Sequence, residues 1–230
     1  MISIDLWILH RFFLKGLFVY INTLSCDPVS RGPFMKIAIV RIFVLSVFFL
    51  LYLTLYNCES DVLEVGQGKA FPKIQQALDS SQDGDEIVVS AGIYTENISF
   101  NGKNIVLRSV SPTTPSVVAA TVIRGKDSGA VVTFSGTETS SCRISGFTIT
   151  GGKGFFGGGI NGNKCSAEIS YNIITENSAG VGKGGGLHKC NGLIEDNVIS
   201  SNTASSGGGL YFCSGAIRNN IIENNRSERY

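Results

Sequence analysis

Three glycine triplets divide the C-terminal part of the chain into units of similar length. They begin at Gly157, Gly184 and Gly207, so they recur after 27 and then 23 residues. A cysteine, an isoleucine and an asparagine follow each triplet at constant mutual spacing: Cys165, Ile169 and Asn172; Cys190, Ile194 and Asn197; Cys213, Ile217 and Asn220. A period in the twenties is typical of solenoids, whose units bury their apolar faces only against their neighbours. The repeat therefore predicts a stack of coils.

A second set of positions keeps the same register. Ile149, Ile174, Ile199 and Ile222 lie 25, 25 and 23 residues apart, and Gly152, Asn177, Asn202 and Asn225 each follow three residues later. Matched positions of stacked parallel strands lie about 4.8 Å apart and form ladders. We expect isoleucine ladders in the interior and asparagine ladders at the bends, where asparagine tolerates left-handed backbone. Insertions beside the triplets, Phe155-Phe156 and residues 179–183, are expected to form loops.

The residues before the repeat predict a short helix followed by short strands. Residues 71–79 place apolar side chains on one helical face, with Pro72 in the first turn, and this helix is expected to cover the first coil. The predicted strands are 86–90, 97–100, 104–109, 117–123 and 130–134. Asn101-Gly102 leaves one antiparallel hairpin open as an alternative.

These segments resemble the right-handed parallel β-helix proteins of the pectin-lyase-like fold. The stretch from Phe71 to Ile98 is similar to the N-terminal cap and first coil of such proteins, and the repeats resemble those of polymorphic outer-membrane and related surface β-helices. The resemblance spans roughly residues 62–225. It implies an all-β solenoid with a short N-terminal capping helix. It specifies the fold and leaves the chemistry open, because this fold carries enzymes, adhesins and passenger domains alike.

The N-terminal residues differ from the rest of the chain. Lys36 and Arg41 precede an apolar run over 42–56, which is short for a membrane span and suits a secretory signal. We expect 1–34 to be an upstream extension or an extra hydrophobic segment, 35–60 a signal peptide or membrane anchor, and 61–230 the β-helix without a C-terminal cap. Lipidation at Cys58, cleavage after Ser60 and an uncleaved anchor are three alternatives. Each places the β-helix outside the cytoplasm, and the lipobox-like Cys58 favours a bacterial cell envelope.

Charge and cysteine content exclude some functions. Lys and Arg total 19 against 18 Asp and Glu, which gives no basic footprint for nucleic acid. His188 is the only histidine after residue 60 and no C-x-x-C occurs, so we expect no metal site. Three cysteines share one repeat position, and Cys142 lies out of register. We expect them to stack as free, small apolar groups, with disulfides as the alternative.

Acidic residues are the candidates for catalysis, but they do not share a repeat register. Glu168 and Asp196 are the best pair for work on a glycosidic bond, with Arg218 as a third group, whereas adjacent Glu195 and Asp196 would face opposite sides of a strand. The resemblance implies calcium only for a lyase, and no cofactor otherwise. For binding, His188 aligns with Tyr211, so a sugar would stack on Tyr211 or Phe212 and hydrogen-bond to His188.

The sequence as a whole favours a structural or binding protein over an enzyme. We expect a glycan or cell-surface partner for the β-helix and membrane contact through the N-terminal segment. A polysaccharide lyase or glycoside hydrolase acting on acidic polysaccharide is the alternative. The last coil exposes strand edges, so we also expect self-association of the isolated β-helix.

Overall fold

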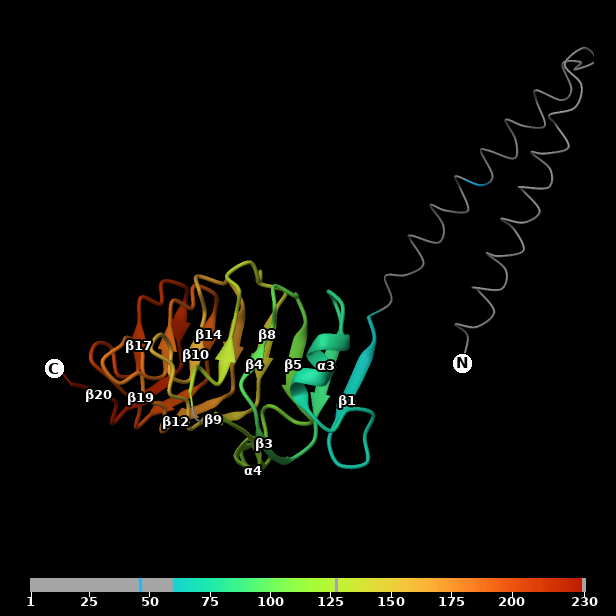
Figure 1. Cartoon of the computed structure of the whole chain (residues 1–230), viewed down its shortest axis with the longest axis horizontal. Coiled ribbons are helices and arrows are strands. Elements are labelled where there is room, and N and C mark those ends of the chain that lie inside the picture. The colour runs from blue at the N-terminus through green and yellow to red at the C-terminus, as the bar shows by residue number, and fades with distance from the viewer. Residues whose placement is uncertain (1–45, 47–59, 127, 229–230) are drawn as a thin grey trace, which may run out of the picture. The chain divides into compact units, whose positions relative to one another are not determined.

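The computed structural model describes Ser46 and residues 60–126 and 128–228, and the predicted extension, signal and lipidation site at Cys58 lie outside these residues, apart from Ser46 and Ser60. Short strands follow one another around successive coils, and equivalent strands of neighbouring coils pair in parallel to form three long sheets (Figure 1). The architecture is the predicted parallel β-helix. No helix among the described residues is long and apolar enough to cross a bilayer.

The first sheet has seven strands, one from each coil. In spatial order these are β1 (Val62–Val65), β2 (Glu86–Val89), β5 (Val106–Ser109), β8 (Arg143–Ser145), β11 (Glu168–Ser170), β14 (Ile194–Glu195) and β18 (Ile217–Arg218). The register pairs Ile144 with Ile169, Ile169 with Ile194 and Ile194 with Ile217, which confirms the first predicted isoleucine ladder.

The second and third sheets complete each coil. The second runs β3 (Gly92–Thr95), β6 (Thr121–Arg124), β9 (Thr148–Thr150), β12 (Ile173–Thr175), β15 (Val198–Ser200) and β19 (Ile221–Glu223). The third runs β4 (Ile98–Ser99), β7 (Val132–Thr133), β10 (Ile160–Asn161), β13 (Leu187–His188) and β17 (Leu210–Tyr211). A short pair, β16 (Thr203–Ala204) and β20 (Arg226–Ser227), lies between them in the last coils. The second isoleucine ladder is confirmed by the pairing of Ile149, Ile174, Ile199 and Ile222.

Stacked side chains fill the interior. Ile169, Ile174, Ile194 and Ile199 are fully buried, and Phe100 and Phe134 stack across two coils with ring centroids 4.5 Å apart. In the last coil the same ladders end at Ile217 and Ile222, which are 42% and 49% exposed.

One asparagine ladder, Asn172, Asn197 and Asn220, lies where the first sheet turns into the second, and the other, Asn177, Asn202 and Asn225, follows the second sheet. Asn172 N–H donates to Asn197 Oδ1 at 2.9 Å, and Asn172 Nδ2 donates to Ile144 O at 3.1 Å. The residue before each ladder position has a left-handed backbone: Gly146, Tyr171, Asp196 and Asn219, with φ of 81°, 57°, 55° and 56°. The chain therefore turns by the same two-residue bend in each of these coils, and the buried amides satisfy the backbone groups that the bend frees.

Three local predictions differ from the structure. Residues 117–120 belong to a helix, α4 (Pro115–Ala120), and the strand begins only at Thr121, because Pro115 sets the first helical turn. The helix α3 (Ile74–Ser80) is present and contacts β1, β2 and β4, but Pro72 precedes its N-cap, Lys73. Asn101-Gly102 closes no hairpin, since β4 pairs in parallel with β7.

Candidate binding surface

The outward-facing positions of the third sheet become aromatic toward its C-terminal end. Ile160, Leu187 and Leu210 point inward, so their neighbours Asn161, His188 and Tyr211 form a row on the outer side. This confirms the alignment of His188 with Tyr211. The row therefore changes from polar to aromatic over three coils.

Glycine triplets bring the loops close to this row. The first glycine of each triplet has a positive φ, and a Cβ built on the second, Gly185, would lie 2.4 Å from Gly208 O of the next coil. Only glycine allows this approach. The inserted residues Phe155 and Phe156 precede one triplet, and residues 179–183 precede the next, as expected for loops.

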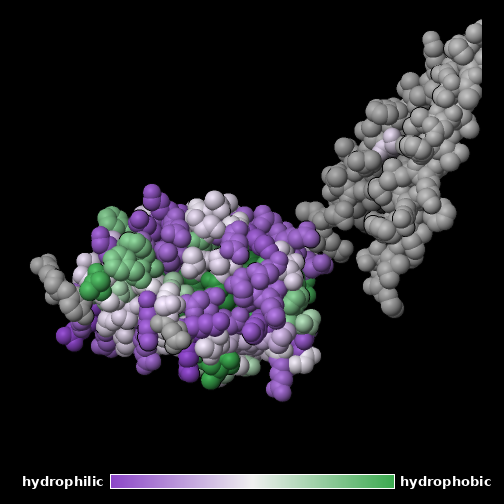
Figure 2. Space-filling view, in the orientation of Figure 1, coloured by the Kyte–Doolittle hydropathy of each residue, from purple (hydrophilic) through white to green (hydrophobic). Residues whose placement is uncertain are grey.

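Five aromatic rings, here called the aromatic cluster, meet on the outer side: Phe155, Phe156, His188, Tyr211 and Phe212. The rings of Phe156, His188 and Tyr211 are nearly parallel, with centroids 4.9 and 5.9 Å apart. Phe155 and Phe212 stand edge-on to the two ends of this stack. Figure 2 shows hydrophobic residues gathered over the coils that carry β10 and β17, beside a largely hydrophilic surface over the earlier coils.

Exposure within the aromatic cluster is uneven. Phe155 and Phe212 are 56% and 70% exposed, whereas His188 is 3% exposed between the rings of its neighbours. His188 Nδ1 lies 3.2 Å from Asn161 Oδ1. Burial, followed by the charges of Lys189 and Lys183, lowers the pKa of His188. His188 is thus a buried member of the stack, and its role as a hydrogen-bonding group for a bound sugar stays a prediction.

Two lysines lie beside the rings. Lys183 Nζ lies 5.2 Å from the centroid of the Tyr211 ring, within the range of a cation–π contact. Lys153 lines an open hollow of about 420 Å³ together with Phe155 and the loop over 178–181. The surface thus combines exposed ring faces with ammonium donors.

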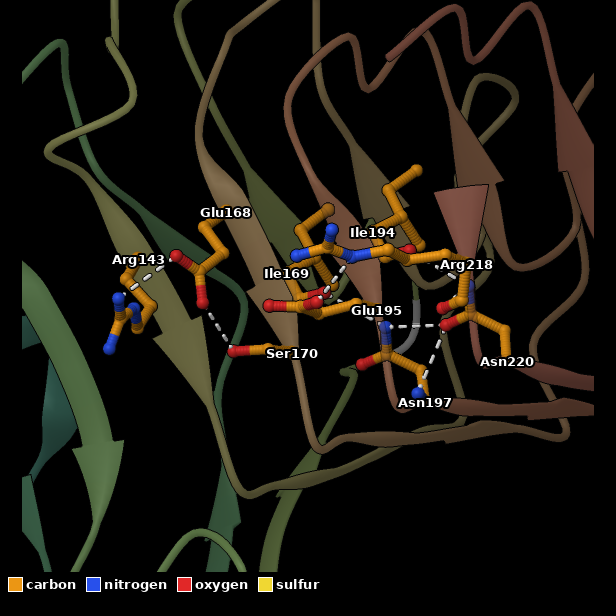
Figure 3. Close-up of polar contacts among 9 residues, drawn as sticks. All are labelled: Arg143, Glu168, Ile169, Ser170, Ile194, Glu195, Asn197, Arg218 and Asn220. Atoms are coloured by element: carbon orange, nitrogen blue, oxygen red, sulfur yellow. Dashed lines mark hydrogen bonds and ion pairs between the residues drawn. The ribbon is translucent and has the colours of Figure 1, made fainter. Parts of the chain in front are cut away.

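The expected catalytic residues lie outside the aromatic cluster, on the first sheet and in the bend that follows it. Glu168 pairs with Arg143 at 2.9 Å and accepts a hydrogen bond from Ser170, both on the first sheet (Figure 3). Arg218 pairs instead with Glu195 at 2.8 Å, on the same sheet. Each of these two carboxylates is therefore neutralised by an arginine of an adjacent coil.

In the described part of the chain, Asp196 forms no ion pair in this row, although its charge and that of Glu168 both act on Arg218. It is in the left-handed bend after β14, so Glu195 and Asp196 do not share a strand as assumed. Its carboxylate accepts a hydrogen bond from Tyr171 of the preceding coil, which raises the pKa of that phenol. No contact joins Asp196 to Glu168 among the described residues. The described residues also contain no group of three or more His, Cys, Asp or Glu placed to hold a metal ion.

Sequence reasoning missed the part that Phe155, Phe156 and Lys183 play in the surface. Phe156 and Lys183 occupy one bridged position, which Ser206 continues in the next coil, but the side chains at this position differ in character. The one available signal was their place directly before the glycine triplets.

The fold and this surface define a solenoid protein of the parallel β-helix class. No family model matches the chain, and no curated protein matches it. Among solved structures it is similar to the pectin methylesterase from Aspergillus niger, crystallised in a penultimately deglycosylated form, with 19% identity and a TM-score of 0.46. The match covers 65% of this chain and 55% of that one, so the chain spans about half of the relative's length. The fold class rests on the strand pairing described above.

Proposed function

We propose that the protein is an extracytoplasmic β-helix that binds glycans through the aromatic cluster. The observation that carries the proposal is the exposure of Phe155 and Phe212 at the two ends of a ring stack that spans three coils. Isolated apolar side chains are ordinary on a surface, but a contiguous exposed group marks an interaction site.

The geometry of the rings favours a sugar over a protein partner. The inner rings stack face to face on one another, whereas Phe155 and Phe212 stand at steep angles to their neighbours and are more than half exposed. An aromatic face binds the apolar C–H face of a pyranose. Lys153 and Lys183, both at the rim, supply donors for the ring hydroxyls. An apolar platform with a few polar groups beside it is the usual composition of a small-ligand site.

The ion-paired acids support binding rather than hydrolysis. Glycoside hydrolysis requires two carboxyl groups that act together on one bond. Glu168 and Glu195 are each paired with an arginine, and Asp196 accepts a hydrogen bond from Tyr171, which holds the equivalent bend position of the preceding coil. This arrangement keeps the candidate acids in structural contacts.

Binding is tested with the full chain and a panel of soluble glycans, using affinity electrophoresis followed by calorimetry on the best ligand. We expect the double variant Phe155→Ala/Phe212→Ala to weaken binding at least tenfold. Ile93→Ala is the matched control, because Ile93 is 63% exposed but lies on the second sheet. Equal affinity of the double variant and the parent would contradict the proposed surface. Release of unsaturated uronides or reducing ends would favour the enzyme instead.

The location outside the cytoplasm is supported by the sequence alone, through the basic residues and apolar run of the 35–60 segment. Fractionation of cells that express a C-terminally tagged full chain tests it. We expect the tag in the medium or the envelope fraction. Recovery only in the cytosolic fraction, with residues 35–60 intact, would overturn it.

A further inference from the structure

Four free cysteines form a column beside the third sheet. Cys142, Cys165 and Cys190 are buried, and Cys213 is half-buried. Cys190 and Cys213 follow the paired residues His188 and Tyr211 at the same distance along the chain. Their thiols adopt the same local conformation, since Cys190 Sγ contacts His188 O at 3.6 Å and Cys213 Sγ contacts Tyr211 O at 3.7 Å. The two residues are therefore direct neighbours on adjacent coils.

This neighbour relation meets the requirement for a disulfide. Matched Cα atoms of stacked coils lie about 4.8 Å apart, within the roughly 4.4–6.8 Å that disulfides span. The two thiols are also in hydrogen-bonding contact with each other. Cys142 lies directly before β8 and Cys165 three residues before β11, so that pair does not share one position along the chain.

The four thiols differ in reactivity. The contact with Cys190 lowers the pKa of Cys213, the one thiol of the four that is not fully buried. Burial raises the pKa of Cys142 to about 12 and that of Cys165 to about 11. The thiolate is the nucleophile in disulfide exchange, so Cys213 reacts first.

We propose that Cys213 is an oxidant-reactive thiol and that Cys190 resolves it, so that a disulfide joins two adjacent coils. The oxidant is a small external disulfide. The Cys213 thiolate attacks one of its sulfurs, which forms a mixed disulfide and releases one thiolate. Cys190 then attacks the Cys213 sulfur, its proton passes to the departing thiolate, and the second thiol is released. The protein loses two electrons and two protons, and the external disulfide is reduced to two thiols.

The bond would fasten the most exposed coil of the stack. It closes a loop between residues 23 positions apart, Cys190 and Cys213, and this loop includes the bend at Asn197. A cross-link of this kind restricts the unfolded chain and stabilises the fold. The surface around Tyr211 and Phe212 would then be held in place in an oxidising compartment, where such bonds persist.

The test uses the full chain with Cys26→Ser and Cys58→Ser, which leaves the four thiols of the column. The reduced protein is treated with oxidised glutathione, and its free thiols are counted after denaturation. We expect the count to fall from four to two and peptide mass mapping to show a link between Cys190 and Cys213. Retention of four thiols, a Cys142–Cys165 link, or a lasting mixed disulfide in this parent would overturn the proposal.

Single variants separate the two roles. Cys190→Ser is expected to stop at the mixed disulfide on Cys213, whereas Cys213→Ser is expected to keep its three thiols reduced. Cys165→Ser is the matched control and should still form the Cys190–Cys213 bond. Rapid oxidation of Cys190 in the Cys213→Ser chain would show that Cys213 is not the attacking thiol. If a variant fails to fold, as judged by circular dichroism, the mapped link in the parent still decides.

Discussion

Asn197 Nδ2 donates to Asn220 Oδ1 at 3.0 Å and to Ile169 O at 2.8 Å, so that one buried amide joins three consecutive coils. Its Oδ1 accepts the backbone N–H of Asn172. Figure 3 shows the contact between Asn197 and Asn220 below the ion pairs of the first sheet. The side chain therefore provides hydrogen-bond partners for backbone groups that have none within the bend itself.

Loss of this amide should destabilise the fold strongly. Asn197→Ala leaves the N–H of Asn172 and the carbonyl of Ile169 buried without their partner, and we expect a loss of about 3 kcal/mol in the free energy of unfolding. Urea denaturation measures it. Asn220→Ala, at the half-buried last position of the ladder, is expected to cost clearly less. Equal effects of the two variants would show that burial does not determine how much the amide contributes to the free energy of unfolding.

Close approach of coils at the glycine triplets makes a second prediction. A Cβ at Gly185 would meet Gly208 O at 2.4 Å and Thr203 O at 2.5 Å, so Gly185→Ala should cost about 3 kcal/mol through displaced backbone. Gly180→Ala is the control, because Gly180 has a φ of 53° but no neighbour within 4 Å. Its backbone cost is about 1 kcal/mol. Thermal denaturation that ranks the two in the reverse order would contradict the packing argument.

Acidification should lower stability through His188. Its pKa is lowered in the folded chain, chiefly by burial, from the ordinary value of 6.5. The unfolded imidazole therefore takes up its proton first as the pH falls through about 6.5, so the unfolded chain binds more protons and gains population. We expect His188→Phe, which keeps the ring stack, to lose less stability than the parent between about pH 7 and about pH 5. The free energy of unfolding is measured by urea denaturation at each pH. The same dependence of this free energy on pH in both chains would exclude a contribution from His188.

The ion pair between Arg218 and Glu195 is expected to be dispensable. Arg218 is exposed, and exposed pairs contribute little because water and salt screen them. Arg218→Gln should leave the denaturation midpoint and the glycan affinity unchanged within error. A loss of affinity without a loss of stability would instead place the first sheet in the binding site.

Spacing alone predicted the ladders because a buried position must recur in every coil to remain buried. This logic fixes Asn172 and Asn197, and it also aligned His188 with Tyr211. It does not apply to α4, where Val117 and Val118 have the β-branched side chains of a strand but follow Pro115 at a helix start. It also misses Phe156, because the same position holds Lys183 and Ser206 in the next two coils, and three side chains of different character do not mark a ladder.

The left-handed bend before each ladder asparagine has a consequence for variation among such chains. Gly146, Tyr171, Asp196 and Asn219 occupy the same backbone geometry with four different side chains. The amide behind each of the last three keeps the turn in place, so the residue in front of it is free to change. A unit of 25 residues, such as 173–197, is thus a module whose in-frame duplication could lengthen the stack of coils. Each added copy would bring one new bend position whose side chain is free to vary and would leave the existing contacts of the interior intact.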